Sequence, residues 1–385
     1  MTYESLQGIR VLDLGIITAG ASTSAVLADL GAEVIKVEGP SYTDPFREWL
    51  GTTDAPNWWN ESPQFRATNR NKSSVCLDLK SERGHGLFMK LVAQSDVVVE
   101  NFRAGVLKRL KIDYETLRAA NPGIILASIS SQGQTGPDSG NTSFGSTLEA
   151  SSGLAYLMRY TGETPKITGR GLNYPDQVAS LFAAGAIMAA LVERHRTGTG
   201  VVLDLSQREL TSFLVGEALV AAAEGNPLES YPIGVPAAIE GLFRAQDDQW
   251  VAVTVGRASA ADAASLIGEE LTRDSLRGWI AVQPAATAAR RLRAVAAAEV
   301  VLQAGQRQDP DRLSTTSSFS RDDQGLQVKG LPMQIGEHCR DKFVSAQTLG
   351  EANERVALEL MGLRQEEFDA LVSERIFSNR PDKAG

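Results

Sequence analysis

The amino-acid sequence predicts an α/β fold: a Rossmann-like large domain with a parallel sheet, a smaller α+β insert domain, and a C-terminal segment that returns to the large domain. Two patterns predict the sheet. Short β-rich runs alternate with stretches of helical spacing, and polar, Gly-rich or basic clusters recur where those runs end. A chain of 385 residues exceeds one ordinary core, and its composition changes near residue 225. We therefore expect domains at 1–225 and 226–330, with 331–385 as the returning segment.

The first elements form a βαβ unit. Residues 9–14 are β-rich and run into Gly15, residues 22–30 have helical spacing, and Gly31 ends that helix before a second β-rich run at 33–37. A right-handed crossover makes two such strands parallel. The same alternation predicts the remaining elements of the large domain, which are strands at 75–80, 96–100, 124–129 and 201–205 and helices at 82–94, 114–120, 148–156 and 209–223.

A nicotinamide site is a competing interpretation of this opening. Glu38 follows the second strand, where a dinucleotide-binding fold places its ribose-binding acid. Gly15 and Gly20, however, have four residues between them and no third glycine in register, so the G-x-G-x-x-G fingerprint is absent. This interpretation ranks last, and the absence of any spectral change with NAD(P)H would remove it.

Basic side chains gather near the predicted carboxyl ends of the strands, the edge at which parallel sheets bind ligands. Together they could neutralise a polyphosphate, although for any single one a solvated surface position is at least as well supported. These residues are Arg70, Lys72, Lys80, Arg103 and Arg109. The aromatic, aperiodic segment 41–65 is typical of a functional or interface loop.

The stretch from Gly169 to Asp176 leads into an apolar run, Val178 to Val192, that predicts a wholly buried helix with a charged exit. Asp176 lies at or beside the N-cap of this helix. Helix N–H groups and the helix dipole keep a carboxylate ionised there, which is one way to present an acid to a pocket. The alternative is that Asp176 only caps the helix, and local sequence favours that alternative.

After a Pro- and Gly-rich linker at 227–236, the pattern predicts a hairpin of 242–244 with 250–255 and a helix from Ser259 to Ile267. The Ala-rich stretch 285–302 predicts a further helix, and 307–324 a polar loop. Helical segments at 345–361 and 366–374 close the chain.

Composition excludes several classes. A net charge of −9 argues against a nucleic-acid partner. The Val178 to Val192 run falls short of the roughly 20 residues that span a bilayer, and the first residues lack a secretory pattern, so we expect a cytoplasmic protein without membrane contact. Cys76 and Cys339 lie far apart, and only His338 adjoins either of them, so the sequence predicts neither a disulfide framework nor a metal site. The three histidines stand in polar settings, which disfavours a catalytic histidine.

Several short motifs, each weak alone, occur in an order that resembles the class III CoA-transferases, the family of formyl-CoA:oxalate and carnitine CoA-transferases. The resemblance covers nearly the whole chain. The motifs are Arg10 to Leu14 with Ala19-Gly20, Leu27 to Glu38, Asn71-Lys72-Ser73, Leu77 to Lys80, Glu100 to Arg103, Gly133 to Pro137, Arg196 to Gly200 and Gly336-Glu337-His338.

The resemblance implies that Asp176 matches the family's catalytic aspartate. It would attack the donor thioester carbonyl to give a mixed anhydride and CoA thiolate, and the thiolate would return to form an aspartyl-CoA thioester that the acceptor carboxylate opens in reverse. With an ordinary aspartate pKa of about 3.9, Asp176 would need no base. Backbone N–H groups of the Gly-rich approach would hold the oxyanion.

The resemblance also implies a CoA-binding set, with CoA and acyl-CoA as substrates and no permanently bound cofactor. This set comprises Thr18, Ala19, Leu77, Asp78, Lys80, Asn101, Phe102, Arg103 and Arg109. The chain has Thr18 where several relatives carry Gln, Gly39 where some carry Arg, and no recognisable Gly-rich flap in the insert, so an acid larger than formate or oxalate is expected. Family habit indicates succinyl-CoA or acetyl-CoA as donor, a carboxylic or dicarboxylic acid as acceptor, and an interlocked homodimer.

Two alternatives share the fold that the resemblance implies. An α-methylacyl-CoA racemase pairs the aspartate with a histidine in the preceding segment, but residues 141–146 contain none. Solvent hydrogen exchange at the α-carbon without CoA movement would establish it. The chain could also be one subunit of a hetero-oligomeric CoA-transferase with a paralogous partner, or a non-catalytic subunit, against which the presence of Asp176 argues.

Overall fold

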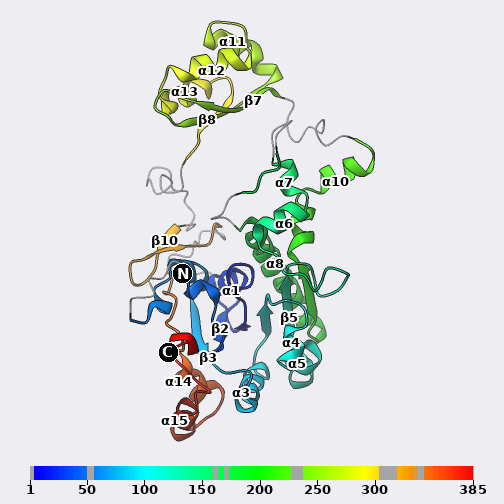
Figure 1. Cartoon of the computed structure of the whole chain (residues 1–385), viewed down its shortest axis with the longest axis vertical. Coiled ribbons are helices and arrows are strands. Elements are labelled where there is room, and N and C mark those ends of the chain that lie inside the picture. The colour runs from blue at the N-terminus through cyan, green and yellow to red at the C-terminus, as the bar shows by residue number, and fades with distance from the viewer. Residues whose placement is uncertain are drawn as a thin grey trace. The chain divides into compact units, whose positions relative to one another are not determined.

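The computed structural model describes residues 4–49, 56–158, 164–168, 173–226, 237–302, 319–333, 335 and 342–384 (Figure 1). The chain divides into two compact units, one made of residues 1–219 with 315–385 and the other of residues 220–314. The predicted linker at 227–236, the Gly169 to Leu172 approach and the Gly336-Glu337-His338 motif lie outside the described residues.

A six-stranded sheet forms the centre of the first unit, and all its neighbouring strands pair in parallel. The predicted α/β class is therefore confirmed. The strands are β1 (Arg10–Asp13), β2 (Glu33–Glu38), β3 (Lys72–Cys76), β4 (Val97–Glu100), β5 (Ile125–Ser130) and β6 (Val202–Ser206). Their order is β3-β2-β1-β4-β5-β6, so the winding direction reverses between β1 and β4. In such sheets the crevice beyond the carboxyl ends of those two strands is the ligand site.

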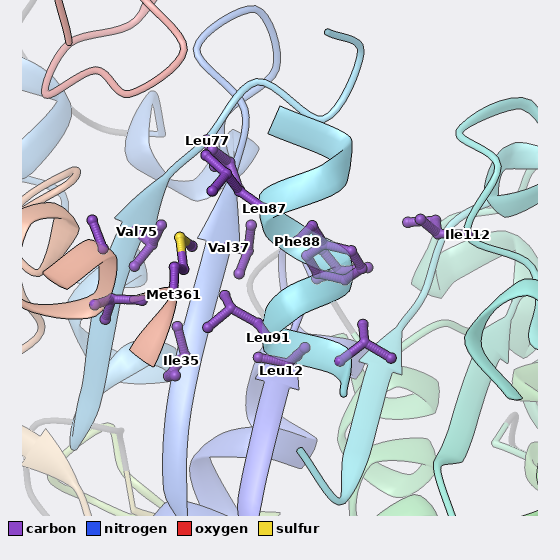
Figure 2. Close-up of a cluster of buried hydrophobic side chains, with 14 of the residues drawn as sticks. Leu12, Ile35, Val37, Val75, Leu77, Leu87, Phe88, Leu91, Ile112 and Met361 are labelled. Carbon is purple, nitrogen blue, oxygen red and sulfur yellow. The ribbon is translucent and has the colours of Figure 1, made fainter. Parts of the chain in front are cut away.

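One face of the sheet is covered by large side chains of α3 (Glu82–Val92), α5 (Tyr114–Ala120) and the C-terminal segment. Figure 2 shows Leu87 and Leu91 of α3 on the side of the helix next to Val37, and Phe88 on the side nearer Ile112. Neighbouring strand residues alternate between the two faces, as the two-residue period of a strand requires. This face is the larger core of the unit.

The other face is covered by α1 (Ala19–Asp29) and α8 (Tyr174–Thr197), which pack on each other and on the sheet. Small residues predominate at their contact, including Ala179, Ala183 and Ala184 of α8, each at most 2% exposed. Small side chains let two helix backbones approach closely.

Helix α8 is only half buried along its circumference. Leu181, Phe182 and Val192 are exposed, so the prediction of a wholly buried helix is wrong. One stripe, made mostly of small residues, meets α1 and β5, while Phe182 on another side packs edge to face against Phe213 of α9 (Gln207–Phe213). The helix runs to 24 residues, longer than the apolar run alone, and is apolar enough by composition to cross a membrane, a criterion that a core helix also meets.

The C-terminal segment covers the free edge of β3. The Ser74 N–H donates to Gln347 Oε1 and the Cys76 N–H to Asn353 Oδ1, each at 2.8 Å, and Leu77 pairs with Phe377 in an antiparallel bridge. Met361 packs against the sheet from the same segment (Figure 2). An edge strand covered in this way offers no free N–H and C=O row to another chain.

The second unit holds an antiparallel sheet of β7 (Ala237–Arg244), β8 (Trp250–Gly256) and β9 (Ala297–Val300), covered by α11 (Ala260–Ile267), α12 (Arg273–Ala281) and α13 (Ala285–Leu292). The predicted hairpin is confirmed. The predicted helix at 285–302 is wrong beyond Leu292, because its end pairs with β8 as β9. Alanine has the highest helix propensity, but helix propensity is a small energetic preference, and tertiary pairing overrides it here.

Three further predictions differ from the structure. The helix expected at 345–361 is confined to α14 (Asn353–Arg355) and a π-helical turn, Val356–Leu360, because residues 342–352 run irregularly. The helix expected at 209–223 is divided into α9 (Gln207–Phe213) and α10 (Gly216–Ala223). The polar loop expected to reach Gln324 includes β10 (Phe319–Arg321), which pairs with β11 (Gln327–Lys329).

The remaining elements of the first unit are short or follow the sequence pattern. Helix α15 (Gln365–Ser373) confirms the prediction at 366–374. The others are α2 (Pro63–Asn69), α4 (Val106–Arg109), α6 (Gly145–Ser151) and α7 (Leu154–Leu157).

Candidate active site

A cavity of about 1130 Å³ lies at the carboxyl ends of the sheet strands, where the winding direction reverses. The loops after β1 to β5 all contribute to its wall, together with the start of α8. The position is the one that the strand order predicts for a ligand. The cavity is large enough for a ligand of cofactor size.

Asp176 lines this cavity from the first turn of α8. The helix begins after Asn173, so Asp176 is its third residue and not its N-cap. The backbone N–H groups of Asp176 itself and of Ala19, the first residue of α1, lie near the carboxylate and favour its charged form. The N-termini of two helices therefore meet at one carboxylate, and both helix dipoles favour its charged form.

Burial outweighs those favourable contacts. Removal from water raises the pKa of Asp176 to about 6, and the two N–H donors oppose this shift without cancelling it. The expectation of an ordinary aspartate pKa is therefore wrong. At pH 7 the side chain is still mostly ionised, and a more basic carboxylate is a better nucleophile.

Thr18 and Asn173 connect the starts of the two helices. The Asn173 side-chain amide donates to Thr18 Oγ1 at 3.4 Å, and these residues stand at the N-cap positions of α8 and α1. Neither cap residue bonds its own helix through its side chain. The start of α1 thus faces the Asp176 carboxylate and has no side-chain cap from Thr18.

Gly15 and Gly20 are required by packing. A Cβ on Gly20 would lie 2.6 Å from Asn101 Oδ1 and from the Cα of Gly15, and one on Gly15 would lie 2.5 Å from the Gly20 carbonyl carbon. Two backbone segments and one amide meet there. Gly15 and Gly20 are therefore explained by close contact between the β1 loop and α1, and not by a site for a pyrophosphate.

Asn101, from the loop after β4, fixes the β1 loop across the winding reversal. Its Oδ1 accepts the Ile16 N–H at 2.7 Å and its Nδ2 donates to the Ile16 carbonyl at 3.0 Å. Below it, Glu100 Oε2 accepts the Phe102 N–H at 2.7 Å while burial raises the pKa of Glu100 to about 7. These contacts set the position of the loop that carries Phe102 and Arg103.

Buried ion pairs support the wall of the cavity nearest β2. Arg47 donates to both carboxylate oxygens of Glu38 at 2.7 to 3.0 Å, and both side chains are almost wholly buried. Burial acts to raise the pKa of Glu38, but the guanidinium of Arg47 outweighs it and holds that pKa below its usual range. Glu38 is therefore committed to Arg47 and not free for a ribose hydroxyl.

Lys72, expected among ligand-binding cations, is also buried in an internal network. Its Nζ donates to Asp13 Oδ2 at 2.8 Å, to Asn69 Oδ1 at 2.9 Å and to the Ala21 carbonyl at 2.7 Å. Burial lowers its pKa to about 8. Arg70 is likewise buried against Asp29. Neither residue lines the cavity.

Most of the other predicted site residues come together around the cavity. Those in its wall are Asp78, Lys80, Asn101, Phe102, Arg103 and Arg109. Leu77 does not join them, because its side chain is wholly buried in the sheet core. Thr18 and Ala19 lie behind the wall, where Ala19 acts through its N–H on Asp176.

Sequence reasoning missed several lining residues. Residues 141–146 line the cavity, and Asn141, Thr142, Ser143 and Ser146 among them carry amide or hydroxyl groups. Trp49 also lines it, from the aromatic segment that the sequence marked as functional in general terms only. Ile17 and Asp44 carry no local signal, and only the fold brings them together. Among the residues that the structure describes, no group of three or more His, Cys, Asp or Glu side chains could hold a metal ion.

Comparison with known proteins identifies the family. The model of CoA-transferase family III matches residues 6–342. The alpha subunit of succinyl-CoA–L-malate CoA-transferase from Chloroflexus aurantiacus is 38% identical over 255 residues, 64% of this chain and 58% of that protein. Succinyl-CoA:glutarate CoA-transferase from Mus musculus is 41% identical over 204 residues, 53% of this chain and 45% of that protein.

The matched region thus spans about half the length of these curated relatives. Among solved structures, a CaiB/BaiF family protein from Brucella suis superposes with a TM-score of 0.79 at 25% identity, covering 92% of this chain and 99% of that one. The order of motifs, the parallel sheet and the match over residues 6–342 agree, and the chain belongs to CoA-transferase family III.

Proposed function

We propose that this protein transfers CoA from an acyl-CoA donor to a carboxylic acid, with Asp176 as the nucleophile. One observation carries the proposal: a carboxylate with a raised pKa stands at the meeting point of two helix N-termini and faces a cavity of about 1130 Å³. A carboxylate that only capped a helix would have no need of the cavity. Membership of a CoA-transferase family supports the same activity.

In the proposed reaction, an Asp176 oxygen attacks the thioester carbonyl carbon, and the carbonyl oxygen becomes an oxyanion. Collapse of that intermediate breaks the C–S bond, releases CoA thiolate and leaves a mixed anhydride. The thiolate then attacks the aspartyl carbonyl, expels the donor acid as a carboxylate and forms an aspartyl-CoA thioester. An acceptor carboxylate attacks this thioester, and the two steps in reverse give the new acyl-CoA and free Asp176.

The basic wall of the cavity is the proposed CoA site. Lys80 lines it from the loop after β3, whereas Arg103 and Arg109 line it from the loop after β4 and the end of α4, and all three would bind the phosphates through charge-assisted hydrogen bonds. Phe102 and Leu79 offer apolar surface between them. In this proposal Asp78 and Asn101 order the loops, and Ala19 contributes its N–H to the nucleophile.

The donor and acceptor are proposed from the relatives. Their names indicate succinyl-CoA as donor and a dicarboxylic acid such as malate or glutarate as acceptor. The hydroxyl and amide groups of residues 141–146 would suit the polar end of such an acid. A panel of acids with succinyl-CoA and acetyl-CoA, analysed by mass spectrometry, would identify the pair.

We propose that the protein acts as a cytoplasmic homodimer. Phe182 and Phe213 lie edge to face with ring centroids 5.9 Å apart and remain 38% and 70% exposed, and neighbouring exposed apolar side chains are typical of a protein interface. Because one relative is named as an alpha subunit, a paralogous partner chain is the alternative. The two compact units, with 331–385 in the first, are proposed as the large domain and its insert.

Trapping the acyl-enzyme tests the function. Incubation with succinyl-CoA alone, followed by hydroxylamine, should convert Asp176 to a hydroxamate that peptide mass spectrometry detects. Asp176→Asn should bind CoA but show no label and lose about 10³-fold or more in transfer. Glu38, Asp44 and Asp78 also line the cavity and serve as internal controls. An unmodified Asp176, or a label on one of those three, would reject the assignment.

A further inference from the structure

The loop after β1 contains a strained residue beside the nucleophile. Ile17 has φ of +58°, the left-handed region that β-branched residues seldom adopt. It lines the cavity that Asp176 faces. Such a conformation persists only where the surrounding structure holds it, and it occurs most often at functional sites.

Three side chains hold this loop from outside. Asp44 Oδ1 accepts the Ile17 N–H at 3.0 Å, and Asn101 bonds both the N–H and the carbonyl of Ile16. Lys36 Nζ donates to the Gly15 carbonyl at 2.6 Å and lies 3.1 Å from Asp44 Oδ2. Lys36 and Asp44 are both essentially inaccessible to solvent. The contact that acts directly on the strained peptide is the one from Asp44.

The direction of the chain after Ile17 decides what Asp176 meets. Asp13 accepts the Gly15 N–H at 2.8 Å, so this N–H and those of Ile16 and Ile17 are all committed to side chains. The next residue, Thr18, is the N-cap of α1, and the following N–H, from Ala19, lies near the Asp176 carboxylate. A change of conformation at Ile17 would therefore swing the start of α1 relative to the nucleophile.

We propose that Asp44 is a positioning residue for the reaction: it holds Ile17 in the left-handed conformation and thereby keeps the Ala19 N–H beside the Asp176 carboxylate. Asp44 touches neither Asp176 nor any reacting atom, and it acts through the loop. With that N–H beside it, the Asp176 carboxylate keeps its position relative to the start of α1. This inference rests on the proposed function of Asp176.

Asp44 also has a local structural role, from which the positioning role must be separated. It accepts the Phe46 N–H at 3.0 Å and caps the short 3₁₀ turn Pro45–Arg47. A purely structural Asp44 would affect folding whatever residue stood at position 17. A positioning Asp44 would matter much less once the residue at 17 adopts the left-handed conformation without strain, as glycine does.

The test is a double-mutant cycle of Asp44→Ala and Ile17→Gly, measured as the single-turnover rate of Asp176 acylation by succinyl-CoA in the full-length protein. Asp44→Ala should slow acylation by about tenfold or more, because small displacements of reacting groups are costly. Calorimetry should find its CoA affinity within about threefold of wild type, since the basic wall is untouched. In the Ile17→Gly background the same substitution should cost less than about threefold.

Asp44→Asn provides a second cycle should Asp44→Ala fail to fold. It retains an acceptor for the Ile17 N–H but loses the charge that faces Lys36, so its acylation rate should lie between those of wild type and Asp44→Ala. Equal costs of the Asp44 substitution in both backgrounds, or a folded Asp44 variant with wild-type acylation, would overturn the inference. If wild-type Asp176 is itself not acylated, the proposed function fails instead.

Discussion

The two faces of the central sheet are built from different residues for different purposes. The face under α3 and the C-terminal segment is filled largely by leucine, valine and phenylalanine, and it meets the cavity only at one edge, through Leu14, Val37, Leu79, Phe102 and Leu110. The face under α1 and α8 is filled largely by alanine and valine, and both of its helices begin at the nucleophile. The large-residue face therefore supplies stability, whereas the small-residue face sets the separation between the starts of α1 and α8.

A cavity in the large-residue face should cost stability without changing the chemistry. Leu91 is wholly buried there, and Leu91→Ala should lower the free energy of unfolding by about 2–5 kcal/mol. The rate of acylation per folded molecule should be unchanged. Urea denaturation measures the change in stability, and single-turnover kinetics measures the acylation rate. A fall in the rate alongside the loss of stability would contradict the claim that this face affects stability alone.

A larger side chain in the small-residue face should affect the acylation rate more than it affects stability. Ala183 is wholly buried where α8 meets α1, and Ala183→Leu should cost about 1–3 kcal/mol in stability. Acylation should fall by up to about 10²-fold, because the start of α8 shifts relative to Ala19. Gly185, on the same helix with open space around its Cα, gives the matched control: Gly185→Ala should leave the rate intact.

Ligand binding should depend on the loops and on neither face. Arg103→Ala should weaken CoA binding by about tenfold, the usual cost of one charge-assisted hydrogen bond, with less effect on acid preference. Arg118, an exposed arginine of α5 outside the cavity wall, serves as control. Calorimetric titration with CoA compares the affinity of Arg103→Ala with that of Arg118→Ala. Equal losses of affinity in the two variants would mean that the phosphates bind elsewhere.

The pH dependence should report the nucleophile on the small-residue face. Since burial raises the pKa of Asp176 to about 6, acylation should rise with pH through that value and level off above it. The same raised pKa means that the folded state binds the Asp176 proton more tightly than the unfolded state does. Stability from this group is thus fully present below about pH 4 and is lost as pH rises through 6.

Asp176→Asn should remove the loss of stability that wild type shows as pH rises through 6. Its free energy of unfolding should exceed that of wild type by on the order of 1 kcal/mol above pH 6 and match it near pH 4. Denaturation at the two pH values checks the sign. Greater wild-type stability at pH 8 would mean that the two N–H donors outweigh burial.

Sequence patterns predicted most strands of the sheet and the helices at 82–94 and 114–120 because each carries its own local signal, whereas the strand expected at 75–80 lies at Lys72–Cys76. The helix at 114–120 has its expected bounds, with Asp113 at the cap and Asn121 at its end. Beyond Leu292, by contrast, alanines favoured helix locally, while β8 offered a distant strand partner that pairs Val251 with Val300 and Thr254 with Ala297. Local preference is informative only where no distant partner competes.

The site divides in the same way. Asp176 and the basic loop residues follow recognisable motifs, and the prediction that they share one ligand site remains to be tested by experiment. The left-handed Ile17 and its contact with Asp44 have no sequence signature, because isoleucine at a positive φ contradicts local preference. Likewise the raised pKa of Asp176 depends on burial, which only the assembled fold determines.

The contacts that Gln347 and Asn353 make with β3 have a consequence for biosynthesis. A ribosome releases β3 long before it releases those two side chains, and all of the second unit is translated in the interval. Until then the outer edge of β3 in the nascent chain has unpaired backbone N–H and C=O groups, which can pair with strands of other chains. A chain truncated before residue 347 should therefore remain bound to chaperones or aggregate, even though it contains every strand of the six-stranded sheet.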